Sequence, residues 1–342
     1  MTSVKNFRVT REATADSLGR GVFEFTDAYS VFDWGKMPDD IPEKGASLCT
    51  MGAFNFEMLA EAGVPTHYRG VIVNGEVRSL EEALDEGHVP REMAIELTQV
   101  PELPFENGAY DYDAYHERAS ENFLVPLEIV FRNRVPVGSS LRKRSEPEDH
   151  GLDVPEWPDV PVDLPDAIVE FSSKYVEQDR YLSREEADAI AGAASVDDLE
   201  SIARDVNRII TEQAERTGLA HEDGKIECLY YDGEVRVADV VGTFDENRFS
   251  YGGQQLSKEV IRQYHKRTQP EWVEAVSEAK ATANEQNIDD WRALCDREPQ
   301  PLEDDVVQAS RDMYCAGTNA YMQAEVFGAP SLEEALATIT EL

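Results

Sequence analysis

Apolar residues along the chain recur at a three- to four-residue spacing in some segments and alternate in others, which predicts both helices and strands. Residues 46–62 show the helical spacing and end at Gly63, a residue that commonly follows a helix. Residues 195–216 show the same spacing and place on one face Leu199, Ile202, Val206 and Ile210. A capping-box pattern at residues 183–186 precedes this second helix. The chain therefore contains at least two helices that pack on a core.

Alternating apolar positions predict a hairpin and several separate strands. Residues 225–230 and 234–241 alternate on either side of Asp232 and Gly233, a pair that favours a tight turn between antiparallel strands. The other predicted strands cover residues 21–25, 71–77, 124–132 and 168–175.

Segments rich in proline, tyrosine and acids divide this pattern. Residues 101–122 and 146–165 are predicted to be irregular surface insertions. We therefore expect an α+β protein with a smaller β-rich lobe at residues 1–98, a larger catalytic lobe at 99–270 and a helical extension at 271–342. No internal repeat was found.

The acidic composition predicts adaptation to salt. Asp and Glu number 69 against 32 Lys and Arg, which gives a formal net charge of -37. Such a charge repels itself in the compact state, and salt screens that repulsion. The acids are spread along the whole chain, which favours a salt-rich cytoplasm such as that of a halophilic archaeon; the alternative is an ordinary acidic cytosolic protein.

Composition also limits the classes of partner. The negative charge argues against nucleic acid, because duplex binding needs Lys and Arg. No apolar run approaches the roughly 20 residues of a membrane span, and residues 1–10 lack a signal sequence, so we expect a cytoplasmic protein that does not bind membranes. The four cysteines have no CxxC spacing, so we expect neither a zinc site nor a disulfide scaffold. The sequence leaves the oligomeric state open, a homo-oligomer included.

Residues 126–144 (PLEIVFRNRVPVGSSLRKR) concentrate positive charge in this acidic chain. The basic residues of the segment are Arg132, Arg134, Arg142, Lys143 and Arg144. Guanidinium groups beside a Gly-Ser-Ser turn offer the donors of a phosphate or carboxylate site. A solvated turn that pairs with neighbouring acids is the alternative, and the segment alone leaves both open.

The predicted hairpin carries a second candidate site. Asp223, Lys225 and Glu227 alternate and therefore share one face of a strand, and Asp239 lies on its partner. Carboxylates on adjacent strands beside a lysine can hold Mg²⁺ next to nucleotide phosphates. The alternative is an exposed, charged hairpin face.

Both segments, in this order, resemble the phosphoribosylaminoimidazole-succinocarboxamide synthases, or SAICAR synthetases, of purine biosynthesis. The family's pattern of Pro, an apolar residue, Glu, three residues, Arg and then Gly-Ser corresponds to Pro126, Leu127, Glu128, Arg132, Gly138 and Ser139, with one extra residue before Gly138. The family's pattern Asp-x-Lys-apolar-Glu-Phe-Gly corresponds to residues 223–229, which end in Cys-Leu instead of Phe-Gly.

The resemblance extends over about residues 15–265, including FEFTDAYSVFD and EKGASLCTMGAFNFEMLAEAGVPTHY in the smaller lobe. The family's phosphate-binding Gly-Lys loop is matched by residues 18–21, in which an arginine replaces the lysine. Its Asp-Glu pair and the following Ser-Pro-Asp-x-x-Arg are matched by Asp239 and residues 242–248, with Val240 in place of the second acid.

Members of this family use ATP to join L-aspartate to carboxyaminoimidazole ribonucleotide (CAIR), and they release ADP and phosphate. The resemblance implies a two-lobed α+β fold, ATP-grasp-like or kinase-like, with the nucleotide in the interlobe cleft. It also implies ATP, Mg²⁺ and small-molecule substrates. Transfer of the γ-phosphoryl group to the CAIR carboxylate gives an acyl phosphate, which the aspartate amine attacks.

The resemblance also implies roles for substrate-binding residues. The ribonucleotide phosphate is held by Arg132, Ser139 and Arg248. A substrate-side loop contains Ser30 and Asp33. The imidazole and its carboxylate are oriented by the catalytic residues Asp223, Lys225 and Asp245.

A further set of residues is implied for the nucleotide and its metal. The ATP phosphates are covered by Gly19, Arg20 and Gly21. Lys174 reaches the nucleotide from the larger lobe, and Glu128 belongs to the same cofactor-binding group. Mg²⁺ is held by Glu227 and Asp239.

Two other functions compete with the ligase: a small-molecule kinase of the same two-lobed class, and a nucleotide-binding module without catalysis. ADP release in the absence of aspartate would favour the kinase. Val240 and the arginine in the Gly-Lys loop are the features that favour the module.

Overall fold

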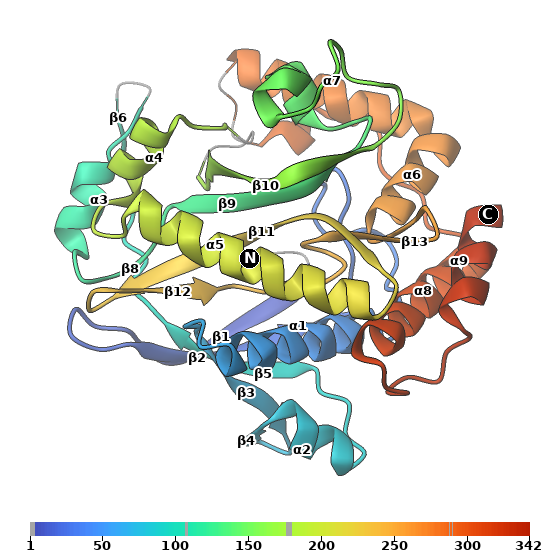
Figure 1. Ribbon diagram of the computed structural model, residues 1–342, viewed down its shortest axis with the longest axis horizontal. Helices are drawn as coiled ribbons and strands as arrows, with labels where there is room; N and C mark the ends of the chain where they lie inside the picture. Colours follow the sequence, from blue (N-terminus) through green and yellow to red (C-terminus); the bar gives the residue numbers. More distant parts are fainter. Residues whose placement is uncertain (1–3, 107–108, 176–179, 287, 289) are drawn as a thin grey trace.

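Two antiparallel sheets, one from each half of the chain, form the frame of the protein (Figure 1). The computed structural model describes residues 4–106, 109–175, 180–286, 288 and 290–342. One hydrophobic cluster extends through both halves, so the two sheets and the helices between them share a core. The α+β class and the helix-and-sheet pattern predicted from the sequence are confirmed.

The smaller sheet has the order β1-β2-β5-β3-β4 and is covered by α1 and α2. Its elements are β1 (Lys5–Arg11), β2 (Gly19–Phe25), α1 (Lys44–Glu61), β3 (Tyr68–Val73), β4 (Glu76–Arg78), α2 (Leu80–Asp85) and β5 (Glu92–Leu97). The prediction of one strand over residues 71–77 is wrong. Asn74 and Gly75 adopt positive φ values of 53° and 83°, and they turn the chain between β3 and β4.

Helix α1 confirms the helix predicted at residues 46–62 and starts two residues earlier. The backbone N–H of Gly45 donates to Asp27 Oδ1 at 3.0 Å, which satisfies a donor of the first turn. A Cβ at Gly45 would lie 2.5 Å from the carbonyl oxygen of Phe25. Glycine therefore lets the start of α1 press against the end of β2.

The larger sheet has the order β10-β9-β11-β13-β14, and β8 and β12 also pair with β11. Its strands are β8 (Asn122–Leu124), β9 (Leu127–Val135), β10 (Val162–Ser173), β11 (Ala220–Tyr231), β12 (Glu234–Ala238), β13 (Arg248–Tyr251) and β14 (Gln254–Leu256). The predicted hairpin is confirmed as β11 and β12, with the turn at Asp232 and Gly233.

The strand predicted at residues 124–132 is interrupted. The backbone N–H of Val125 still donates to Cys228 O, but Pro126 has no N–H to continue the ladder. Strands β8 and β9 therefore pair with separate parts of β11. Residues 176–179 lie outside the described residues, and β10 ends at Ser173 within the predicted strand 168–175.

The two predicted insertions are more regular than expected. Residues 101–122 contain β6 (Phe105–Glu106), β7 (Ala109–Tyr110) and α3 (Tyr112–Arg118). Helix α3 forms because the side chain of Asp111 accepts a hydrogen bond from the N–H of Ala114 at 2.9 Å. In residues 146–165, a 3₁₀ turn covers Pro147–His150, and the last four residues belong to β10.

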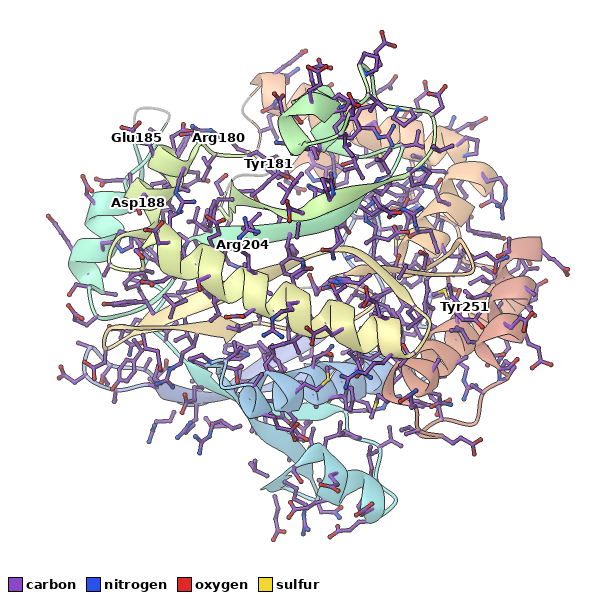
Figure 2. The ribbon with its side chains drawn as sticks, in the orientation of Figure 1. Arg180, Tyr181, Glu185, Asp188, Arg204 and Tyr251 are labelled. Carbon is purple, nitrogen blue, oxygen red and sulfur yellow. The ribbon has the colours of Figure 1, made fainter. Side chains whose placement is uncertain are left out.

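Helices α4 (Arg184–Ala191) and α5 (Val196–Arg216) cover one face of the larger sheet. The capping box at Ser183 and the apolar stripe of α5 are both confirmed. In Figure 2, Tyr181 lies above β10 and Arg204 of α5 lies below it, where Arg204 Nη1 donates to Ala167 O at 3.0 Å. With α5 on one face, the opposite face of β9, β10 and β11 is left to carry a site.

The last part of the chain is helical, as predicted. It contains α6 (Glu259–Thr268), α7 (Pro270–Gln286), a 3₁₀ turn (Trp291–Leu294), α8 (Asp304–Met322) and α9 (Leu332–Glu341). Helix α8 packs against α1 of the smaller lobe (Figure 1). The lobe boundaries at residues 98 and 270 remain a prediction. Within the described part of the chain, no helix has the length and hydrophobicity of a membrane span.

Candidate functional site

Two cavities lie along strand β11. The first, which we call the interlobe cavity, has a volume of about 890 Å³ and is lined by both sheets. The second, which we call the charged pocket, has a volume of about 580 Å³ and is lined by the larger sheet and the segments that follow it. Asp223 and Lys225 line the charged pocket, whereas Glu227 lines the interlobe cavity. One strand therefore contributes side chains to both.

The alternation along β11 explains this arrangement. Asp223, Lys225 and Glu227 share the face opposite α5, because side chains of a strand change face at every residue. A Cβ at Gly224 would lie 2.2 Å from Asn247 Nδ2, so glycine leaves room for the Asn247 side chain. Asn247 Nδ2 in turn lies 2.8 Å from Nε2 of His221. The predicted alternative of an exposed hairpin face is wrong for Asp223, which is 5% exposed.

Among the described residues, equal numbers of cations and carboxylates line the charged pocket. Its cations are Arg132, Lys225, Arg248, Lys258, Arg262 and Lys280. Its carboxylates are Asp33, Glu128, Asp223, Asp245, Glu246 and Glu259. In a chain of charge -37, this local balance makes the pocket far more favourable to an anion than the average surface.

Asp223 joins the two predicted phosphate-binding arginines. Arg248 Nε donates to Asp223 Oδ1 at 2.8 Å, and Arg132 Nη1 donates to Oδ2 at 3.4 Å. Arg132 Nε also donates to Glu170 Oε2 at 2.8 Å. Burial alone would lower the pKa of Arg132, but Tyr181, Glu170 and Asp223 raise it. Both guanidinium groups are thus held as cations at the pocket.

The basic segment divides into two parts. Arg144 stacks 3.6 Å from the ring centre of Tyr181 and donates to Glu170 at 2.7 Å, so it supports Arg132. Arg142 instead donates to the carbonyl oxygens of Val135 and Val160 at 2.9 and 2.7 Å, which ties down the turn. The segment therefore contributes Arg132 to the lining of the charged pocket and forms a structural turn at Arg142.

The Gly-Ser turn does not reach the pocket. Ser139 is not among the described residues that line the charged pocket. Its Oγ accepts a hydrogen bond from the N–H of Leu141 at 3.3 Å and begins the 3₁₀ turn Ser140–Lys143. The structure thus shows Ser139 as the cap of this turn, and its predicted contact with the ribonucleotide phosphate remains a prediction.

Lys225 lies at the centre of the face that joins the two cavities. Its Nζ donates to Glu128 Oε1 at 2.7 Å. Burial alone would lower the pKa of Lys225, but Glu246 and Glu128 raise it, so the amine stays protonated. Glu128, predicted among the ATP-side residues, lines the charged pocket.

The predicted substrate-side loop reaches the pocket at one residue. Asp33 lines the charged pocket and forms an ion pair with Lys280 of α7 at 2.5 Å. Ser30 is not among the described residues that line this pocket.

The interlobe cavity combines an apolar wall with a polar inner end. Its apolar lining includes Phe7, Val9, Phe23, Ile95, Leu97 and Leu229. Its inner end contains Lys5, Lys174, Glu227 and Asp239. A flat, partly apolar ligand that carries an anionic group would match both parts.

The carboxylates at this inner end each pair with a lysine. Glu227 pairs with Lys174, and Asp239 pairs with Lys5. Burial and the neighbouring Asp239 raise the pKa of Glu227. Burial would also raise the pKa of Asp239, but Lys5 and Lys174 lower it. The two carboxylates interact electrostatically, and carboxylate oxygens are donors that Mg²⁺ prefers, so this end of the cavity is compatible with a dication that also binds phosphate oxygens.

The predicted Gly-Lys loop is a strand in the structure, and its role in covering the ATP phosphates remains a prediction. Gly19, Arg20 and Gly21 form the start of β2, between β1 and β5, and are not among the described residues that line the interlobe cavity. A Cβ at Gly19 would lie 2.5 Å from Arg11 O, so this glycine serves the close approach of two strands. Arg20 Nη1 donates to Glu96 at 2.6 Å. Val240, in place of an acid, packs toward Gly52 of α1.

Sequence reasoning missed several polar residues of the site. Lys5 lines the interlobe cavity from the first strand. Lys258 and Arg262 bring two more cations to the charged pocket. Lys44 and Tyr314 contact Asp245 from behind. A signal existed for Lys44, because it is a lone cation at the start of an apolar helix.

The fold and the site define a two-lobed α+β protein in which a nucleotide-sized cavity adjoins a pocket for a charged second ligand. The family model of SAICAR synthetase matches residues 12–279. The chain belongs to the SAICAR synthetase family.

Relatives and solved structures agree with this assignment. A protein of Archaeoglobus fulgidus, provisionally named a phosphoribosylaminoimidazole-succinocarboxamide synthase, is 39% identical over 350 aligned positions, covering 100% of this chain and 99% of its own. The synthase of Thermoplasma acidophilum is 28% identical and covers 86% of this chain and 90% of its own.

Solved structures share the fold at low sequence identity. The SAICAR synthase of Saccharomyces cerevisiae in complex with SAICAR has a TM-score of 0.62 at 19% identity, with 95% of this chain and 94% of that chain covered. A SAICAR synthetase in complex with ADP has a TM-score of 0.53 at 22% identity, with 88% and 99% covered. The two-lobed fold inferred from the sequence is confirmed.

Proposed function

We propose that this chain catalyses the ATP-dependent ligation of L-aspartate to CAIR, which gives SAICAR, ADP and phosphate in purine biosynthesis. Family membership supports this reaction. The observation that carries the proposal is the continuous face of β11, on which Asp223, Lys225 and Glu227 connect the charged pocket to the interlobe cavity. A reaction that transfers a phosphoryl group from one ligand to another needs such adjoining sites.

CAIR would occupy the charged pocket. Arg132 and Arg248 already share Asp223 as a counter-ion, and a phosphate could bind to the same guanidinium groups. Lys225 and Asp245 would orient the imidazole and its carboxylate. Lys225 lies where it can neutralise both the carboxylate and the incoming phosphoryl group, because it stands between the two cavities.

ATP would occupy the interlobe cavity, with the base against the apolar wall and the phosphates toward Lys174 and Lys5. Glu227 and Asp239 would hold Mg²⁺, which neutralises phosphate charge when bound. Phosphorylation of the CAIR carboxylate would give an acyl phosphate. The aspartate amine would then attack the acyl carbon, form the C–N bond and release phosphate.

A single assay tests the reaction. The protein is incubated with ATP, Mg²⁺, CAIR and L-aspartate, and each component is omitted in turn. We expect stoichiometric ADP and SAICAR only in the complete mixture, with SAICAR detected by mass spectrometry. Steady ADP release without aspartate would favour a small-molecule kinase, and the absence of turnover with retained ATP binding would favour a nucleotide-binding module.

We further propose that the protein works in a salt-rich cytoplasm with small molecules as its partners. The support is the net charge of -37, carried by acids spread along the sequence. Molar KCl should raise the melting temperature relative to low salt, because screening weakens repulsion between these acids. A melting temperature that stays constant or falls would contradict this proposal.

A further inference from the structure

Asp245 is held by two residues from opposite ends of the chain. Lys44 Nζ, at the start of α1, donates to Asp245 Oδ2 at 2.6 Å. Tyr314 Oη, from α8 in the C-terminal extension, donates to Asp245 Oδ1 at 2.7 Å. Both oxygens of this carboxylate are therefore engaged from behind, while Asp245 lines the charged pocket.

The helices that carry Lys44 and Tyr314 are also joined by hydrogen bonds. Ser47 Oγ donates to the carbonyl oxygen of Tyr314 at 3.0 Å and lies 2.7 Å from Thr318 Oγ1. One turn earlier in α8, Arg311 Nε donates to Glu43 Oε2 at 2.8 Å. Helix α8 is thus fastened to the first turn of α1, at the level of Asp245.

The burial of Lys44 indicates that its contact with Asp245 is an ion pair between a buried ammonium group and a carboxylate. The side chain of Lys44 is 0% exposed and that of Asp245 is 7% exposed. A buried ammonium group is costly unless a carboxylate pairs with it, and removal of one partner leaves a buried charge without compensation. The ring of Tyr314 also lies 5.3 Å from Lys44 Nζ, which adds a cation–π contact.

We propose that Lys44 and Tyr314 are positioning residues that hold Asp245 ionised and oriented toward the charged pocket, so that the C-terminal extension completes the active site. This inference rests on the proposed function, in which Asp245 orients the imidazole and its carboxylate. Neither residue touches the substrate in this arrangement. They act through Asp245.

The chemistry follows from the hydrogen-bond capacity of a carboxylate. Each oxygen offers two lone-pair positions, so each can bind one donor from behind and one N–H from a substrate. Burial alone would raise the pKa of Asp245, but the cations Lys44 and Lys258 and the hydrogen bonds from Lys44 and Tyr314 lower it. Asp245 therefore remains an acceptor for an N–H donor at neutral pH, and two fixed oxygens cannot rotate away.

A matched pair of tyrosines in α8 provides the first test. Tyr314→Phe removes the hydrogen bond to Asp245, whereas Tyr321→Phe removes an equally buried hydroxyl that donates to Asn55 at 2.8 Å. We expect Tyr314→Phe to lower kcat about tenfold with an unchanged KM for ATP, because one charge-assisted hydrogen bond is lost. Tyr321→Phe should keep the kcat of the wild-type protein. Equal kcat values in the two variants would overturn the proposal.

Lys44 provides a second test through the pH profile. Lys44 from α1, Tyr314 from α8 and Lys258 before α6 lower the pKa of Asp245, and the charged residues that line the same pocket nearby include Glu246, Glu259 and Arg262. In Lys44→Met the pKa of Asp245 should rise, so the acid limb of the kcat profile should move to higher pH. Lys44→Arg keeps a cation and should restore part of this shift. If Tyr314→Phe does not fold, identical profiles for Lys44→Met and Lys44→Arg would still overturn the proposal.

The wild-type protein separates the two levels of inference. If it forms no SAICAR from the complete mixture, the proposed function fails. If it forms SAICAR and Tyr314→Phe behaves as Tyr321→Phe does, only the positioning role fails. In an Asp245→Asn background, Tyr314→Phe should add little further loss, because a residue that acts through Asp245 has no separate effect.

Discussion

The charged pocket and the interlobe cavity meet at β11 but are assembled differently. Charged residues dominate the pocket, and ion pairs such as Arg248–Asp223 and Lys225–Glu128 hold them in place before any ligand binds. The interlobe cavity is larger and is lined by apolar residues of both sheets; besides the charged residues of its inner end, its lining includes Glu12, Glu96, Glu102 and Arg118. The pocket is therefore preorganised by electrostatics and the cavity by packing between lobes.

This difference explains why the sequence predicts the residues of the charged pocket better than those of the interlobe cavity. Most of the pocket's predicted residues lie in two short motifs on neighbouring strands, so local patterns identify them. The cavity draws Lys5 from the first strand and Lys174 from after β10, so no single motif describes it.

Removal of a charge from the pocket should have the largest effect. Arg132→Ala removes one of the two arginines that pair with Asp223 and one of the two that pair with Glu170, and it removes a ligand of the proposed phosphate site. We expect kcat/KM for CAIR to fall a hundredfold or more, about 3 kcal/mol, with little change in the KM for ATP. Steady-state kinetics with each substrate varied in turn measures both.

The control is Arg134→Ala, in the same segment. Arg134 pairs with the exposed Asp163 at 3.3 Å and is not among the described residues that line the charged pocket. It should keep near-normal kinetics. A similar loss in both variants would mean that the segment acts through its fold and not through Arg132.

Substitution of a carboxylate at the inner end of the interlobe cavity should change the Mg²⁺ requirement of the reaction. Glu227→Gln keeps the shape of the side chain and removes its charge, so the Mg²⁺ concentration for half-maximal rate should rise by about tenfold to a hundredfold. Glu234, on the adjacent strand of the same hairpin, pairs with Arg236 and is not among the described residues that line the interlobe cavity, so Glu234→Gln serves as the control. An unchanged Mg²⁺ requirement in Glu227→Gln would remove Glu227 from the metal site.

The β1–β2 hairpin should give a smaller effect. Lys5→Met removes a cation of the interlobe cavity and should raise the KM for ATP about tenfold, the cost of one charge-assisted hydrogen bond. Arg20→Met removes the cation that the sequence pattern favoured and should leave this KM unchanged, because Arg20 pairs with Glu96. The reverse outcome would restore Arg20 to the nucleotide site.

The smallest effect is expected for two buried histidines, one beside each cavity, which should make the free energy of unfolding depend on pH. Burial lowers the pKa of His67, at the interlobe cavity, and of His221, under the charged pocket, to about 4 in each case. Between pH 6.5 and 4 the unfolded chain binds more protons than the folded one. As the pH is lowered through this range, the free energy of unfolding should therefore fall by at most about 1.4 kcal/mol per pH unit for each histidine.

Urea unfolding at several pH values measures this slope. His67→Gln and His221→Gln should each remove about half of the contribution of the pair. If only one substitution flattens the slope, the two sites differ in how well they exclude water.

The strand motifs were predictable because their physics is local. The period of two in Asp223, Lys225 and Glu227 requires one shared face, and the structure confirms it. Arg132, opposite Asp223 on β9, follows from antiparallel pairing. These residues could be identified before any tertiary contact was known.

The remaining features depend on contacts that the local sequence pattern does not contain. The glycines at 19 and 21 matched a loop pattern, but strand packing against Arg11 and Leu97 explains both. Ser139 followed a matching Gly-Ser pair, but its hydroxyl caps a 3₁₀ turn. Lys44 and Tyr314 lie 270 positions apart in the chain, and only the packing of α8 on α1 brings them together.

The alternation of side chains along β11 also limits which insertions and deletions the sequence can accept. The register shift between His221 and Asp223 precedes the three site residues, so the chain can absorb irregularity there. After that point, the insertion or deletion of one codon between Asp223 and Glu227 would turn one part of the strand over and send its carboxylate toward α5. We expect descendants of this sequence to vary freely in the hairpin turn at Asp232 and Gly233, yet to keep Asp223 and Glu227 four positions apart.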